Sequence, residues 1–237
     1  LGIEFLPEIS PGTVADYVAT WHKSVVRKPG GSVYVPDKDL YNETRIFDDR
    51  LTYDKGGSLV HMLRFETGND SLFFAALRNY LNTYKYGNAD VSDLINSLKA
   101  ATGIDFTTFF NEWYYGEGYP AYTVTYTQNG KIIHIKSAQS VSMPSITPFF
   151  KMKMEYKIQT TKGDTIIVHY QDSAVENFDI KINGSVTGII ADPNDWVIDG
   201  TDKQKDPAPI KIPLKEEQPA VNNFPGRKSV IAVEAEE

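Results

Sequence analysis

The segment Tyr53-Asp54-Lys55-Gly56-Gly57-Ser58-Leu59-Val60-His61-Met62-Leu63-Arg64 sets the pattern of the first half of the chain. Its two glycines are followed by a mostly apolar run, which predicts a buried helix, and Gly68 stands where that helix would end. Tyr53 lies at the predicted mouth of the helix. A tyrosine there either packs in the core or donates a hydrogen bond to a developing negative charge, and the residues alone leave both possibilities open.

Further amphipathic helices are predicted on both sides of this segment. In each of them apolar residues recur at helical spacing after a residue that favours a helix start. The predicted starts are Ser10-Pro11, Asn69, Asp90 and Asp105. Asp93, three residues after Asp90, suggests a capping box. Residues 32–52 carry turn-forming and mixed polar residues, so we expect a long loop there with a short extended piece near residues 33–35.

The hydrophobic pattern changes to a period of two after the Gly116–Pro120 junction. Turn signals at Asn129-Gly130, Lys162-Gly163-Asp164 and Asn183-Gly184 predict three hairpins, with a last short strand at 196–198. Several short strands at this spacing are typical of a β-sandwich. The sequence therefore predicts an α plus β chain: a helical lobe of about five helices over residues 1–118, an antiparallel β-sandwich over 119–200, and an extended tail over 201–237.

Composition excludes several classes of function. The net charge is −7 and no basic stretch offsets it, which argues against general nucleic-acid binding. The chain has no cysteine, so disulfides, thiol nucleophiles and thiolate metal sites are excluded. No apolar run approaches the ~20 residues that span a membrane. The composition does not determine the cellular compartment.

Few residues offer chemistry on their own. The four histidines never stand four residues apart, so no helix presents a zinc-binding pair. We expect His61 to pack within its helix. Glu112 and Glu117 are a weak pair of candidate acids. The acidic stretch after Asp192 invites a calcium interpretation, but its spacing does not fit a helix-loop-helix calcium site, and a solvated turn is the simpler interpretation.

Several segments together resemble the aminopeptidase N-like zinc metallopeptidases, or gluzincins. The helix that follows Tyr53 is similar to the Tyr-x-Lys-Gly-(Ala/Gly) helix of that family. Further segments stand in the family's order, and all of them together cover about residues 30–122. They are Gly68-Asn-Asp-Ser-Leu-Phe-Phe, Leu77-Arg-Asn-Tyr-Leu, Tyr86-Gly-Asn-Ala-Asp-Val-Ser-Asp-Leu, Gly103-Ile-Asp-Phe-Thr-Thr-Phe-Phe-Asn-Glu-Trp and Gly118-Tyr-Pro. The β segment ending at Asp192-Pro-Asn-Asp-Trp resembles the sandwich that follows the catalytic domain.

The resemblance implies a role for Tyr53. In that family, zinc held by His-Glu-x-x-His and a downstream glutamate activates water for peptide hydrolysis. The tyrosine of Tyr-x-Lys-Gly hydrogen-bonds the oxyanion of the tetrahedral intermediate, and Tyr53 occupies that position. We therefore expect Tyr53 to line a half-cleft that is open to solvent in this chain.

The same resemblance implies what this chain lacks. The zinc motif and the acidic residues that bind the substrate amine would all lie before Leu1. We therefore expect a C-terminal part of a zinc aminopeptidase-like protein that binds no catalytic zinc by itself and hydrolyses nothing. Its partners would be the upstream metal-binding half and, in the longer protein, a peptide substrate.

The sequence is also consistent with two other functions. One is a binding or scaffold protein that keeps the peptidase fold without its metal site. The other is a sandwich that docks carbohydrate or protein through its tyrosine-rich strands.

Overall fold

The computed structural model describes residues 13–201. Helices come first along the chain and strands follow, so the predicted helical part and antiparallel β part are confirmed. The helical segments are α2 (Val14–Val25), η1 (Asp37–Asp39), α3 (Glu43–Ile46), η2 (Asp49–Lys55), α4 (Gly56–Thr67), α5 (Asp70–Tyr84), α6 (Val91–Thr102), α7 (Thr107–Phe110) and η3 (Asn111–Tyr115). The strands are β1 (Pro120–Asn129), β2 (Ile132–Val141), β3 (Met152–Thr160), β4 (Thr165–Gln171), β5 (Val175–Lys181) and β6 (Val186–Ala191).

Two predicted features lie outside the described residues: the helix start at Ser10-Pro11 and residues 202–237 of the tail. The domain boundaries at residues 118 and 200 stay predictions. Within residues 13–201, none of the helices is both long and apolar enough to cross a membrane.

Local signals in the sequence fix the helix ends. Asn69 caps α5 by accepting a hydrogen bond from Leu72 N, and Asp90 with Asp93 forms the predicted capping box of α6. Gly68 and Gly103 end α4 and α6 with φ values of 65° and 75°. These left-handed conformations cost glycine little, and they let the chain leave each helix sharply.

The strands form two three-stranded antiparallel sheets, ordered β1-β2-β5 and β4-β3-β6. Strand β3 shows the pattern most clearly: alternate residues from Met152 to Ile158 are fully buried, and the residues between them are partly exposed. This period of two is that of a strand whose one face packs against the second sheet.

The predicted third hairpin at Asn183-Gly184 is wrong. Strand β5 pairs with β2, whereas β6 pairs with β3, so the chain crosses from one sheet to the other at this turn. The side chain of Gln128 in β1 holds the crossing. Its Nε2 donates to Gly184 O at 2.9 Å, and its Oε1 accepts from Val186 N at 2.9 Å. The side-chain amide thus replaces the backbone partner that a hairpin would supply.

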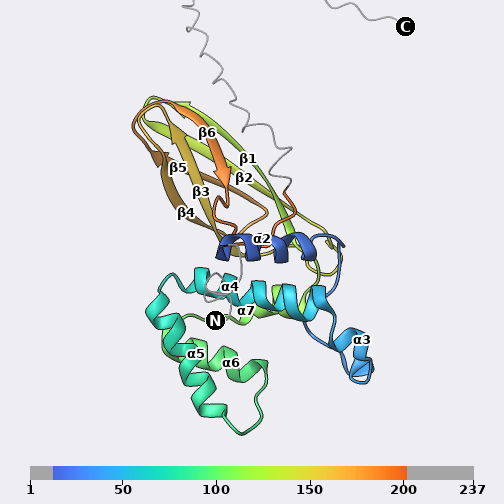
Figure 1. Ribbon diagram of the computed structural model, residues 1–237. Coiled ribbons are helices and arrows are strands. Elements are labelled where there is room, and N and C mark those ends of the chain that lie inside the picture. Colours follow the sequence, from blue (N-terminus) through green and yellow to red (C-terminus); the bar gives the residue numbers. More distant parts are fainter. Residues whose placement is uncertain (1–12, 202–237) are drawn as a thin grey trace, which may run out of the picture.

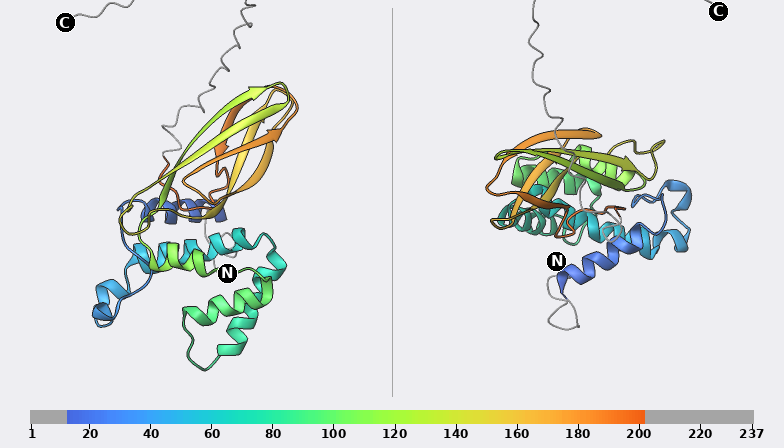
Figure 2. Two further views of the ribbon diagram at one scale, coloured as in Figure 1. Left: turned by 180° about the vertical axis from the view of Figure 1, so that it is seen from behind. Right: turned by 90° about the horizontal axis from the view of Figure 1, so that it is seen from above.

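The two parts of the structure share one core. Figures 1 and 2 show the sandwich standing on one side of the helical layer, with the α5–α6 hairpin on the opposite side. Where the parts meet, the fully buried Trp113 of η3 packs on Phe150 with ring centroids 4.3 Å apart. The Trp196 ring, which follows β6, stacks on Phe65 of α4 at 5.1 Å.

Two carboxylates from the helical layer bind the free edge of β3. Pairing with β6 begins only at Tyr156, so the first residues of β3 lack a neighbour on that side. Glu112 accepts from the N–H of Lys151, the residue just before β3, at 2.7 Å, and Glu66 accepts from Lys153 N in β3 at 2.5 Å. Amides that would otherwise be unpaired at a sheet edge are therefore satisfied by glutamates of η3 and α4.

Candidate functional site

Tyr53 lies inside a π-helical turn rather than at a helix mouth. The turn η2 runs from Asp49 to Lys55 and continues directly into α4. Asp48 starts it, because its side chain accepts a hydrogen bond from Leu51 N at 2.7 Å. The prediction that Tyr53 precedes the helix is therefore wrong by one turn. Single π-helical turns inside longer helices occur often at functional sites.

Lys55 anchors this turn in the interior. Its side chain is fully buried, and Nζ donates to Gly31 O at 3.0 Å and to Gly116 O at 3.4 Å. Burial, together with the charge of Arg50, lowers the pKa of Lys55 to about 7. The lysine thereby ties the turn to the loop after α2 and to the junction that leads into the sandwich.

The loop after α2 is held by further charged groups. Gly31 has a φ of 104°, a conformation that glycine adopts readily, and its N–H donates to Glu117 Oε2 at 2.8 Å. Arg50 of η2 donates to Gly30 O at 2.9 Å. Glu117, which the sequence offered as a candidate acid, therefore holds a backbone amide.

Gly57 provides the close approach of α4 to α2. A Cβ at this position would lie 3.1 Å from the ring of Trp21, whereas a Cβ at Gly56 would meet nothing closer than 3.8 Å. The second glycine of the motif thus lets α4 pack closely on α2, where an added Cβ would press on the Trp21 ring. The first glycine meets no such constraint.

The Tyr53 side chain points outward from the anchored turn. Two residues apart on a helical turn lie on nearly opposite sides, so a buried Lys55 places Tyr53 on the solvent side. Tyr53 is 54% exposed, and among residues 13–201 its hydroxyl has no hydrogen-bond partner. The interpretation of Tyr53 as a core residue therefore does not hold.

The loop beside Tyr53 is ordered by Arg45. Its guanidinium donates to Ser32 O and to Tyr34 O, both at 2.8 Å, and to Thr52 Oγ1 at 3.4 Å. The expected long loop over residues 32–52 thus contains the short helices η1 and α3, and α3 projects from the body of the molecule (Figure 1). Residues 33 and 34 form a bend in place of the expected extended piece, and this bend binds the π-helical turn η3, because Val33 N and Tyr34 N both donate to Tyr114 O.

The four histidines lie in separate surroundings. His61 stacks on Trp196, outside its own helix, at 4.5 Å, and burial lowers its pKa to about 4. His134 binds Asp179 at 2.6 Å, and His169 stacks on Phe178 at 3.9 Å. His22 is buried in α2. Over the described range, no three His, Asp or Glu side chains converge to hold a metal ion. The residues present therefore do not fit a catalytic zinc site.

The acidic stretch after β6 is part of the local fold. Asp192 is fully buried, and its carboxylate accepts from Trp196 N at 2.9 Å and from Val197 N at 3.1 Å. Residues 196–198 follow the turn at 193–194 without forming a strand, so the expected last strand is absent from the described part of the chain. The prediction of a solvated turn is wrong for Asp192, because its buried carboxylate accepts hydrogen bonds from backbone amides.

Sequence reasoning missed Lys55 and Glu66, and it offered Glu112 only as a candidate acid together with Glu117. The sequence showed Lys55 only as part of the Tyr53 motif and did not indicate its burial, because lysine side chains are usually exposed. Glu112 is half-buried, and burial raises its pKa to about 7. Burial raises the pKa of Glu66 too. No local pattern distinguishes such glutamates from solvated ones.

Comparisons with known proteins find similarity to aminopeptidases. Residues 30–113 match the family described as the peptidase family M1 domain. The chain is 28% identical over 165 residues to "Aminopeptidase 2, mitochondrial" of Saccharomyces cerevisiae, an alignment that covers 66% of this chain and 17% of that protein. It is 39% identical over 75 residues to "Aminopeptidase N" of Lactococcus lactis, which covers 32% of this chain and 9% of the relative.

A solved structure supports the same fold. The crystal structure of Legionella pneumophila aminopeptidase A in complex with aspartic acid matches with a TM-score of 0.57 and 13% sequence identity. That match covers 79% of this chain and 22% of the other. The chain thus spans less than a quarter of the length of these relatives. The resemblance to the aminopeptidase N-like family is confirmed, and the comparisons support a peptidase-like protein.

Proposed function

We propose that this chain, whose residues 30–113 match the peptidase family M1 domain, is the C-terminal portion of a zinc aminopeptidase-like metallopeptidase. In the longer protein the reaction would be release of N-terminal amino acids from peptides. The contribution of this chain would be Tyr53, as the hydrogen-bond donor to the oxyanion of the tetrahedral intermediate.

One observation carries the proposal: an exposed tyrosine with an unengaged hydroxyl stands on a backbone turn that is fixed from the interior. An oxyanion donor must be preorganised, because its hydrogen bond has to be available where charge develops in the transition state. Two features support this role for Tyr53: Lys55 binds the backbone turn to Gly31 O and Gly116 O, and the phenol stays free. A phenol is also a neutral O–H donor near pH 7.

Zinc would have to be held elsewhere in the longer protein. The described residues contain no group of metal ligands, so we assign no zinc ligand to this chain. We expect the isolated 237-residue chain to bind no catalytic zinc and to hydrolyse no peptide. Metal analysis of the purified chain and an aminopeptidase assay test this. Stoichiometric zinc with turnover that a chelator abolishes would overturn it.

The substitution Tyr53→Phe in the longer protein tests the role of the tyrosine. It removes one hydroxyl and leaves the ring, so we expect kcat to fall by about 10²–10³ with KM nearly unchanged. Tyr41→Phe is the matched control, because Tyr41 is 98% exposed in the same part of the chain and has no assigned role. Equal kcat values for the two variants would remove Tyr53 from the mechanism.

A scaffold without catalysis is the second candidate, and the anchoring contacts themselves favour it. Lys55 and Gly57 are explained by packing alone, through the two carbonyls and the Trp21 ring. The sequence of the longer gene separates the candidates. A His-Glu-x-x-His motif about a hundred residues before Tyr53 supports the peptidase. Its absence supports the scaffold.

A further inference from the structure

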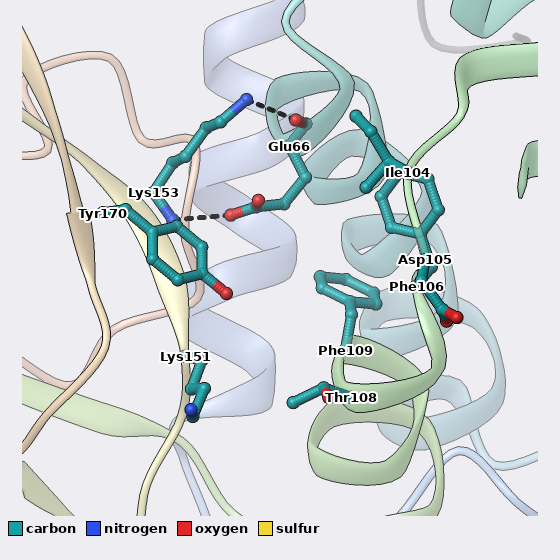
Figure 3. Close-up of a pocket in the computed structure, with 9 residues that line it drawn as sticks. All are labelled: Glu66, Ile104, Asp105, Phe106, Thr108, Phe109, Lys151, Lys153 and Tyr170. Carbon is teal, nitrogen blue, oxygen red and sulfur yellow. Dashed lines mark hydrogen bonds between the residues drawn. The ribbon is translucent and has the colours of Figure 1, made fainter.

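A cavity of about 250 Å³ lies where the helical layer meets the sandwich. Figure 3 shows its two walls: the labelled residues between Ile104 and Phe109 stand on one side, and Lys151, Lys153 and Tyr170 stand on the other, at the start of β3 and in β4. Glu66 at the end of α4 lies between them. The lining residues come from four separate segments, so the cavity exists only because the two parts pack together.

The helical wall of the cavity is mainly apolar. Phe106 and Phe109 are 2% and 6% exposed, and their rings meet edge to face with centroids 6.5 Å apart. Ile104 extends this wall. Such a surface accepts an apolar or aromatic body and offers ring faces that attract a cation.

Most charged groups around the cavity are already engaged elsewhere. Lys151 Nζ pairs with Asp172 at 2.5 Å, and Lys153 Nζ donates to the backbone carbonyl of Glu66. Asp105 pairs with Lys99 at 2.6 Å. Each lysine ammonium thus has an oxygen partner, whereas the Glu66 carboxylate has no side-chain cation bound to it among the described residues and would repel an incoming anion.

Glu66 and Tyr170 keep hydrogen-bonding capacity. Glu66 is 9% exposed, and within the described residues its carboxylate accepts one hydrogen bond, from Lys153 N at 2.5 Å. An ionised carboxylate has about four acceptor sites, so this buried group is under-satisfied. Burial raises its pKa for the same reason. The Tyr170 hydroxyl, which points across the cavity in Figure 3, has no partner among residues 13–201.

We propose that this cavity binds a small organic ammonium ion with an apolar body, held by the Glu66 carboxylate and the Tyr170 hydroxyl against the Phe106 and Phe109 rings. A charged N–H donor satisfies the carboxylate with a charge-assisted hydrogen bond. The apolar body displaces water from the aromatic wall. Nothing in the assignment of Tyr53 depends on this site, and neither proposal requires the other.

Titration of the ¹⁵N-labelled 237-residue chain with benzylammonium chloride near neutral pH tests the proposal. We expect a Kd on the order of 1 mM, because few atoms make contact, with the largest amide shifts at Phe109, Lys153 and Tyr170. Benzyl alcohol has the same shape without the charge, so it should bind at least ~10-fold more weakly. Lowering the pH so that Glu66 is protonated should weaken binding of the cation.

Two variants and one control assign the binding groups. Glu66→Gln keeps an oxygen for Lys153 N, and it should weaken benzylammonium binding at least ~10-fold. Tyr170→Phe should weaken it by about threefold. Glu155→Gln should leave the affinity unchanged, because that side chain binds Asn194 and does not line the cavity. Equal affinity for amine and alcohol, shifts outside the cavity, no response at about ten times the expected Kd, or an unchanged Glu66→Gln variant would each overturn the proposal.

Discussion

At the turn that carries Tyr53 and at the free edge of β3, a charged side chain forms hydrogen bonds with backbone groups. The charge is positive at the turn and negative at the strand edge. At the turn, the buried Lys55 donates to two carbonyls, and its pKa falls to about 7. At the strand edge, Glu112 accepts a hydrogen bond from the backbone N–H of Lys151, and burial raises the pKa of Glu112 to about 7. At both places, backbone groups that lack a partner in the helix or sheet bind a charged side chain instead. The difference is that Lys55 fixes one turn so that Tyr53 faces outward, whereas Glu112 joins two layers.

Removing the lysine from the turn should have the largest effect on stability. Lys55→Met keeps the length of the side chain but leaves two buried carbonyls without their donor, so we expect the free energy of unfolding to fall by ~2–3 kcal/mol. Urea denaturation measures it. Lys99→Met, which breaks an exposed ion pair with Asp105, is the control and should cost no more than ~1 kcal/mol. Equal losses would show that Lys55 is not an anchor.

The two glycines that follow Lys55 should differ in their response to alanine. Gly57→Ala places a Cβ 3.1 Å from the Trp21 ring and should destabilise the chain by ~1–2 kcal/mol through overpacking. Gly56→Ala finds ordinary contact distance and should be neutral or stabilising by up to ~1 kcal/mol, since alanine favours the helix. Denaturation curves of the pair give the answer. A Gly57→Ala chain as stable as Gly56→Ala would contradict the packing of α4 on α2.

The two junctions should respond to pH with opposite signs. The pKa of Glu112 is raised from 4.5 to about 7, so the folded state holds this proton more tightly and stability falls as pH rises between those values. The pKa of Lys55 is lowered from 10.5 to about 7, so the folded state releases this proton earlier and stability rises with pH across that range. We therefore expect these two groups to give a minimum of stability near pH 7.

The substitution Glu112→Gln tests the predicted fall in stability between pH 4.5 and about 7. The amide oxygen still accepts from Lys151 N, but no proton is exchanged, so the decline in melting temperature between pH 4.5 and about 7 should flatten. Glu155→Gln reports the effect of deleting a carboxylate elsewhere on β3. A Glu112→Gln chain that keeps the full decline would show that Glu112 does not carry it.

Local signals in the sequence were enough for much of the fold. The capping pair Asp90–Asp93 and the terminal glycines Gly68 and Gly103 act on residues next to them, so their effect is readable from the sequence. The alternation in β3 is equally local. The hairpin at Asn183-Gly184 failed for a different reason: the turn residues favour a reversal but do not specify which sheet the next strand joins. That choice is made by long-range contacts such as Gln128 with Val186.

The candidate site was only partly readable. The Tyr53 motif drew attention to this turn, but the π-helical geometry and the outward direction of the tyrosine depend on Lys55 reaching Gly31 and Gly116. Those contacts join positions far apart in the sequence. The burial of Glu66 and Glu112 likewise depends on two layers meeting, which no periodicity records.

The most direct test of the role of Tyr53 compares its effect on a charged tetrahedral ligand and on a planar one. A phosphinic peptide analogue in the longer protein presents an anionic oxygen where the oxyanion would form, whereas an amino-acid amide presents a neutral planar carbonyl. If Tyr53 donates to that oxygen, Tyr53→Phe should weaken phosphinate inhibition by about 10²-fold and leave inhibition by the amide nearly unchanged. Equal changes for both ligands, or none for either, would contradict the assignment of Tyr53 as the oxyanion donor.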